Sequence, residues 1–228
     1  MKIFSYESRF SQIVMRFAYA CILSGLWICC SLPIFTIGAS STALYAVTLK
    51  IADKEEGQIV KQFFRAFRDN FKQATVIWLI MLGLAVFLGL DVYILLHLRT
   101  STIGPVAVAW TLILAMVIVC IIVWTILLMY LFPLVAKVEN TTPNMFKNSF
   151  LIGVRYLFCT ILVFAIHFAM FVIVVRFFAP LMFFAPGICA WLSSYLLSPV
   201  IRACTQPRND SGTPSLDGNG QENTNEVA

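Results

Sequence analysis

Long apolar runs alternate with short basic segments along almost the whole chain. A helix needs about 20 apolar residues to cross a hydrocarbon core of about 30 Å, because each residue rises about 1.5 Å. The pattern therefore predicts six crossings and an all-α fold, a polytopic membrane helical bundle. The expected crossings are residues 13–32, 36–50, 74–98, 105–136, 156–178 and 181–201.

The second of these segments, residues 36–50, is short for a full crossing. At the rise of a regular helix it covers only about 22 Å. Three arrangements fit this length: a crossing with little tilt, an extension to Ala52, or a segment buried inside the bundle.

A different pattern occurs at residues 59–72, between the second and third crossings. This pattern is typical of an amphipathic helix in the headgroup plane, with cations facing anionic lipid. The alternative is a helix packed on a protein core, which we favour less because no soluble domain is evident. The expected apolar stripe is Val60, Phe63, Phe64, Phe67 and Phe71, and the expected basic face includes Lys61, Arg65, Arg68 and Lys72.

A second amphipathic stretch, from Phe146 to Val154, is expected to run directly into the fifth crossing. The pattern ends near residue 202. We therefore expect one membrane domain over residues 1–202. Residues 203–228 are rich in Asn, Gly, Ser, Thr, Pro and Glu, and this composition predicts a disordered polar tail.

Charge supports the same reading. Of all residues, 60% are apolar and 12% are charged, whereas soluble domains carry about 25% charged residues. With six crossings and both termini inside, 14 of the 16 Lys and Arg residues lie on the inner side, as the positive-inside rule requires. If residues 36–50 do not cross, the split worsens to 11 against 5. The basic residues flank apolar runs, which indicates lipid headgroups and not nucleic acid.

Few ionisable residues fall inside the expected crossings. A carboxylate in hydrocarbon costs roughly 2.5–3.5 kcal/mol or more, so Asp91 in the third crossing should face a partner. We expect it to pair with Arg176, or otherwise with Tyr93 or His97. His167 lies near the middle of the fifth crossing, where a hydrogen bond to a neighbouring helix is the simplest role. Asp91, His167 and Arg176 are thus the candidate intramembrane polar site.

Motifs of catalysis are missing from the sequence. It contains no phosphate-binding loop, no G-x-G-x-x-G, no H-E-x-x-H and no Cys and His cluster with the spacing of a metal site. The seven cysteines form no C-x-x-C pair and suit apolar packing. We therefore expect no enzyme activity, no catalytic residues, no cofactor and no metal.

Two stretches resemble a known family. LPIFTIGASSTALYAVTLK at residues 32–50, followed by EEGQIVKQFFRAFRDNFKQATVIWLI at residues 55–80, closely resembles the YesL-like family of bacterial membrane proteins. The resemblance includes LDVYILL around Asp91 and continues more loosely from Asn144. It implies a small multi-pass protein of the bacterial cell membrane, in a family often encoded near genes for carbohydrate uptake and degradation. That family has no assigned function, so no site residues carry over.

Two functions remain open at this point. The leading one is a non-catalytic accessory or scaffold protein linked to carbohydrate uptake, with anionic lipid and transporter subunits as partners. The alternative is a small-solute transporter or channel that uses Asp91 and His167 in the bundle interior, along a path lined by Ser24, Thr125 and Ser193. The sequence leaves the oligomeric state open.

Overall fold

The computed structural model describes residues 9–53, 57–99, 105–138, 140–176 and 182–205. Within this part of the chain the secondary structure is helical, with no strand. The order is α1 (Arg9–Ser31), the short 3-10 helix η1 (Ile34–Thr36), α2 (Ile37–Ala52), α3 (Ile59–Arg99), α4 (Pro105–Lys137), α5 (Thr142–Arg155), α6 (Leu157–Arg176) and α7 (Ala185–Thr205).

Six of the described helices are long and apolar enough to cross a membrane. This confirms the predicted all-α bundle and its six apolar segments. The six segments are Val14–Ser31, Ile34–Ala52, Ile59–His97, Val108–Lys137, Leu157–Arg176 and Ala185–Cys204.

Helix α2 forms the centre of the bundle. It packs against α1, α3, α4 and α7, and most of its residues are buried. Together with η1 it reaches 19 residues, so two of the three expected arrangements hold at once: the segment is extended to Ala52, and it is buried in the bundle. Its hydroxyl groups are satisfied there, since Thr42 donates to the Gly38 carbonyl at 2.9 Å and Ser194 of α7 donates to Thr48 at 2.8 Å.

The prediction of a separate interfacial helix at residues 59–72 is wrong, because these residues form the first part of the long helix α3. It runs unbroken over 41 residues, about 60 Å at the usual rise, because no glycine or proline interrupts the step into the apolar segment. Phe63 is fully buried and Phe67 packs against the core, so part of the phenylalanine stripe contacts protein. Phe64 remains exposed.

The Phe146–Val154 stretch leads directly into the fifth spanning helix, as expected, but the two do not form one continuous helix. The helix breaks at Tyr156, whose φ and ψ are −109° and 48°, so α5 and α6 are separate helices. The Thr160 hydroxyl donates to the carbonyl of Gly153 at 2.9 Å, one of the last-turn carbonyls that a helix end leaves without a backbone partner. A side chain of α6 thereby caps α5 at the break.

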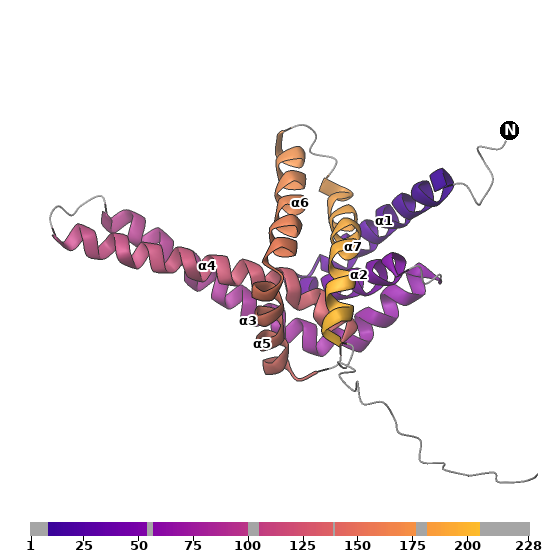
Figure 1. Cartoon of the computed structure of the whole chain (residues 1–228), viewed down its shortest axis with the longest axis horizontal. Coiled ribbons are helices and arrows are strands. Elements are labelled where there is room, and N and C mark those ends of the chain that lie inside the picture. Colours follow the sequence, from indigo (N-terminus) through magenta and orange to yellow (C-terminus); the bar gives the residue numbers. More distant parts are fainter. Residues whose placement is uncertain (1–8, 54–56, 100–104, 139, 177–181, 206–228) are drawn as a thin grey trace, which may run out of the picture.

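Away from the centre, α3 and α4 leave the bundle together as a long hairpin (Figure 1). The indole of Trp124 donates to the Met81 carbonyl at 3.1 Å and marks the base of this hairpin. We call α3 beyond Met81 and α4 before Trp124 the arm. Figure 1 shows the arm and α6 leaving the bundle in different directions.

At the other end of the chain, α7 continues to Thr205. This end lies three residues past the predicted domain limit at 202. The predicted tail from residue 206 onward lies outside the described residues.

Replacing Gly38 with alanine should destabilise the fold, because α2 approaches α3 most closely there. An added Cβ would collide with the Cβ of Trp78 and lie 2.5 Å from the Ala74 carbonyl oxygen. Neither atom is the flexible end of a side chain, and overpacking of this kind costs about 1–3 kcal/mol. Thermal unfolding of the purified chain in mild detergent should therefore shift down by several degrees.

Gly83→Ala is the matched control, since nothing lies within 4 Å of a Cβ added there. Alanine stabilises a helix over glycine by roughly 0.5–1 kcal/mol, so this variant should melt at or above the parent temperature. A Gly38→Ala variant as stable as the parent would contradict the close approach of α2 to α3.

Candidate functional site

The most strongly bound charged group in the described structure is the carboxylate of Asp53. It caps the C-terminal end of α2, where its backbone N–H donates to the Leu49 carbonyl at 2.9 Å, and its side chain is only 7% exposed. The Lys137 ammonium lies 2.7 Å from Oδ2, and the Arg202 guanidinium lies 2.9 Å from Oδ1. The Ser198 hydroxyl also donates to Oδ1. We call these four residues the Asp53 cluster.

The Asp53 cluster joins the C-terminal ends of three helices. Lys137 is the last residue of α4, and Arg202 lies in the last turn of α7. A helix C-terminus carries partial negative charge, which favours both cations and disfavours the carboxylate at the end of α2. The two cations offset that unfavourable position, so the three ends stabilise one another.

Two opposing effects set the pKa of Asp53. Burial acts to raise the pKa, but hydrogen bonds from Lys137, Ser198 and Arg202 and the charge of Lys137 outweigh it and hold the pKa below its ordinary range. The carboxylate is therefore ionised at neutral pH. A group held ionised by two cations is a poor general acid or base at that pH, and its clear role is to clamp the helix ends.

Sequence reasoning did not identify Asp53. The residue stands next to Lys54, Glu55 and Glu56, a run that looks like an ordinary solvated loop. One weak signal was available: Ser198 and Arg202 are four residues apart, so they share a helix face. Nothing in the spacing connects that face with Lys137 and Asp53, which are remote in the chain.

The predicted intramembrane site is not assembled within one chain. Asp91 lies in the arm, whereas His167 and Arg176 lie on α6. Neither Asp91 nor Arg176 forms an ion pair or a hydrogen bond with any residue in the described part of the chain. The predicted Asp91–Arg176 pair is therefore wrong for a single copy, because the arm and α6 diverge (Figure 1). Tyr93 and His97, the other expected partners of Asp91, stack their rings on each other, with ring centroids 5.9 Å apart.

His167 has a local role. Its Nδ1 lies 2.9 Å from the Val163 carbonyl of the preceding turn, so the ring bonds to its own helix. The hydrogen bond that the structure shows for His167 is therefore within its own helix, and not to a neighbouring helix as expected from the sequence.

The polar path that a transporter would need gains no support from these positions. Ser24 is buried between α1 and α7, where it donates to the Phe184 carbonyl at 2.9 Å and accepts from the Gly187 N–H at 2.9 Å. Thr125 bonds to the Ile121 carbonyl of its own helix at 2.8 Å. Ser193 is buried in α7. These hydroxyl groups lie on separate elements, and neither Ser24 nor Thr125 bonds to Asp91 or His167.

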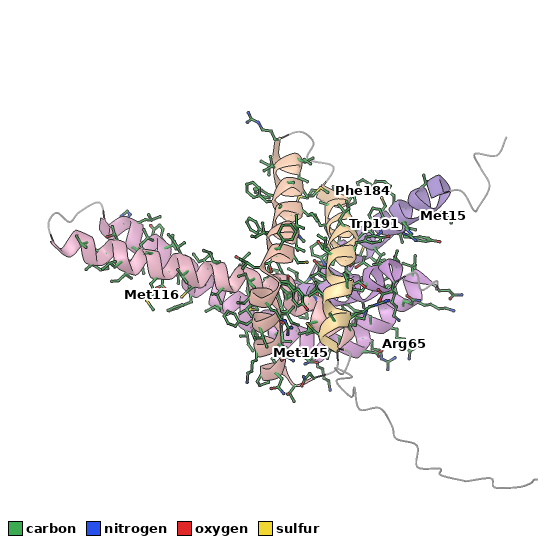
Figure 2. The ribbon with its side chains drawn as sticks, in the orientation of Figure 1. Met15, Arg65, Met116, Met145, Phe184 and Trp191 are labelled. Atoms are coloured by element: carbon green, nitrogen blue, oxygen red, sulfur yellow. The ribbon has the colours of Figure 1, made fainter. Side chains whose placement is uncertain are left out.

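The predicted basic face is exposed along the first half of α3. Lys61, Arg65, Arg68 and Lys72 all lie on the surface, and Figure 2 shows Arg65 projecting outward from the bundle. Arg65 also lies 3.7 Å from Asp69 one turn later, with both side chains largely exposed, a geometry that contributes little to stability. The four cations are therefore accessible to a negatively charged surface.

In the part of the chain that the structure covers, no three His, Cys, Asp or Glu side chains are grouped to hold a metal ion. The cysteines are free thiols, and they are spread over several helices.

These features define a class: an all-α protein with six helices able to span a membrane, clamped at one end by a buried ion cluster. Residues 20–92 match a family described as "Protein of unknown function, DUF624". Over 197 residues the chain is 26% identical to "Uncharacterized protein YteU" of Bacillus subtilis (strain 168). The aligned region covers 83% of this chain and 79% of that protein. No solved structure matches the chain.

The family match includes α2, Asp53 and Asp91, and it ends before α4 begins. Lys137, Ser198 and Arg202 lie outside it. The likeness supports kinship with a family that has no assigned activity, and the more specific YesL-like resemblance stays a prediction.

Asp53→Asn should destabilise the fold by about 2–3 kcal/mol. Breaking a fully buried ion pair costs roughly 3–5 kcal/mol, and the loss is smaller here because Lys137 and Arg202 keep 26% and 51% of their side-chain exposure. The measurement is thermal unfolding in mild detergent at pH 7. Asp69→Asn makes the same change at an exposed pair and should cost under about 1 kcal/mol. Equal losses for the two variants would contradict the clamp.

The contribution of Asp53 should depend on pH in one direction only. Its pKa in the folded chain is lowered, so the stabilisation is complete above the ordinary value of about 4 and is lost as pH falls through the lowered pKa. The difference in melting temperature between the parent and Asp53→Asn should stay constant from pH 8 to pH 5 and shrink below about pH 4. A difference that already closes near pH 6, or one unchanged at pH 3, would contradict this assignment.

Proposed function

We propose that this chain is a non-catalytic accessory or scaffold protein of the bacterial cell membrane, which binds a membrane partner such as a carbohydrate-transporter subunit. The observation that carries the proposal is the exposed apolar surface of the arm. None of the most apolar 18-residue stretch of α4 is buried within the chain. A helix that is apolar on all sides suits lipid or the membrane helices of another protein.

Shape supports a partner in addition to lipid. The bundle around α2 is packed and clamped by the Asp53 cluster, whereas the arm extends away from it (Figure 1). A rigid base with an extended apolar hairpin offers another protein a long surface of fixed geometry. The carbohydrate setting comes from the resemblance of residues 32–80 to a family encoded beside such genes.

The threading of the chain supports a cytosolic basic face. The Asp53 cluster gathers the C-terminal ends of α2, α4 and α7, which are the second, fourth and sixth spanning segments. In six alternating crossings these three ends lie on the same side of the membrane, the inner side if the N-terminus is inside. The basic face of α3 begins a few residues after Asp53, so Lys61 and Arg65 would meet the anionic inner leaflet, at about 1 kcal/mol for each cation.

The buried polar groups support a role without catalysis. Asp53 is held ionised by its partners, while Asp91 and His167 lie on helices that diverge. A catalytic centre needs acid, base or nucleophile within hydrogen-bond reach of one another. No such set occurs among the polar residues described above.

Affinity purification of the full chain in mild detergent should recover a transporter subunit in near-stoichiometric amount. Leu112 and Met116 are one turn apart on the arm, and they are 67% and 71% exposed; Figure 2 shows Met116 pointing away from the bundle. Replacing both with tryptophan keeps the surface apolar for lipid but changes its shape. This double variant should lose at least nine-tenths of the recovered partner.

Phe158→Trp is the control, because Phe158 is at least as exposed as Leu112 and Met116 but lies on α6. It should leave recovery of the partner unchanged. A parent chain that purifies without any partner would count against the scaffold role, and equal recovery with the double variant would show that the partner does not dock on the arm.

A further inference from the structure

Asp91 is a carboxylate in the mostly apolar arm, and no partner for it occurs among the described residues. Leu88 lies three residues before it and Leu95 four residues after it, and both are buried. Residues at these spacings share a face of a helix, so Asp91 lies on the side of α3 that faces α4, at the edge of their contact, and is half-buried. No hydrogen bond or ion pair reaches it within the described chain. In hydrocarbon such a group needs a cation beside it.

Arg176 is the complementary group. It is the last residue of α6, its side chain is exposed, and no carboxylate in the described residues pairs with it. Its helix is also one of the least buried in the structure. Among the described residues, Asp91 is therefore the one acid without an ion pair, and Arg176 is an exposed base on a helix that points in a different direction.

In the predicted threading, the two groups lie at similar distances from the inner ends of their spanning segments. Asp91 lies 19 residues after Lys72, the last cation before the apolar part of α3, and Arg176 lies 19 residues after Leu157, the first residue of α6. Each interval measures about 29 Å along a helix. Both helices run in the same direction in the predicted threading. If an α6 packed alongside an α3 with these starting points level, the guanidinium would reach the carboxylate.

We infer that two copies of this chain associate through this pair, with α6 of each copy packed along the arm of the other. Asp91 of one copy then binds Arg176 of the second copy, and the same contact repeats in reverse, as a twofold interface requires. An Arg–carboxylate pair of this kind is charge-assisted and can be bidentate. Exposed phenylalanines on both helices, Phe87 on α3 and Phe171 on α6, supply apolar contact beside it.

This interface is separate from the partner site proposed on α4. The dimer uses Asp91 on α3, whereas the docking test above changes Leu112 and Met116 on α4. A parent chain that is a dimer but recovers no transporter subunit would contradict only the partner site. A parent chain that recovers the subunit but is monomeric would contradict only the dimer.

The test is the oligomeric state of the full chain in lipid nanodiscs, measured by mass photometry. The parent should be a dimer. Asp91→Arg and Arg176→Asp should each weaken the dimer at least tenfold, because each places like charges together at both contacts. Asp69→Arg and Arg68→Asp are the matched charge reversals on the exposed face of α3 and should leave the dimer unchanged.

A mixing experiment separates a lost contact from a misfolded variant. When an Asp91→Arg chain and an Arg176→Asp chain with different tags are expressed together, both contacts in the mixed dimer regain opposite charges. The two tags should therefore purify together, although each variant alone is monomeric. A monomeric parent, single reversals that leave the dimer intact, or a mixture that fails to associate would each overturn the inference.

Discussion

Burying the carboxylate of Asp53 is the physical step on which the bundle depends. Removing a charge from water costs several kcal/mol unless paired groups replace the lost hydration. Here the replacement comes from three side chains on two other helices, Lys137, Ser198 and Arg202. The end of α2 therefore cannot separate from α4 or α7 without exposing or orphaning a charge. One ionised group fixes three helix ends that are distant in the chain.

This clamp complements the close packing of α2 with its neighbours. Dispersion and hydroxyl bonds act along the length of α2: Gly38 lets α3 approach, and Thr48 accepts a hydrogen bond from Ser194 of α7. Such contacts are short-ranged, and small residues let helix backbones meet closely even in lipid. Beyond Met81 the arm has neither an ion cluster nor such close packing against the bundle. Its two helices therefore contact mainly each other, and their outer faces remain exposed.

Periodicity and composition were sufficient to predict the six apolar segments, because the 1.5 Å rise and the bilayer thickness leave few alternatives. They could not predict that α3 continues through residues 59–72 while the chain breaks at Tyr156. The two amphipathic stretches look alike in sequence, and the difference arises from tertiary contacts: Phe63 packs on the core, whereas Thr160 caps the carbonyl of Gly153. The Asp53 cluster was missed for a related reason. Its partners lie 84 and 145 residues away, and each looks like an ordinary helix-end residue.

The two carboxylates nearest the apolar segments, Asp53 and Asp91, differ in whether the described chain supplies them with ion-pair partners. Asp53 has two cations and a hydroxyl from its own chain. Asp91, deeper in an apolar helix, has none within the described residues, and the expected cation, Arg176, lies on a helix that points elsewhere. Hydrocarbon tolerates an unpaired carboxylate poorly, which is the basis of our inference that a second copy supplies the cation. The same arm exposes apolar side chains on nearly every side. Charge and apolar surface thus support the same inference independently of each other: we infer that the arm is the part of this protein that another chain completes.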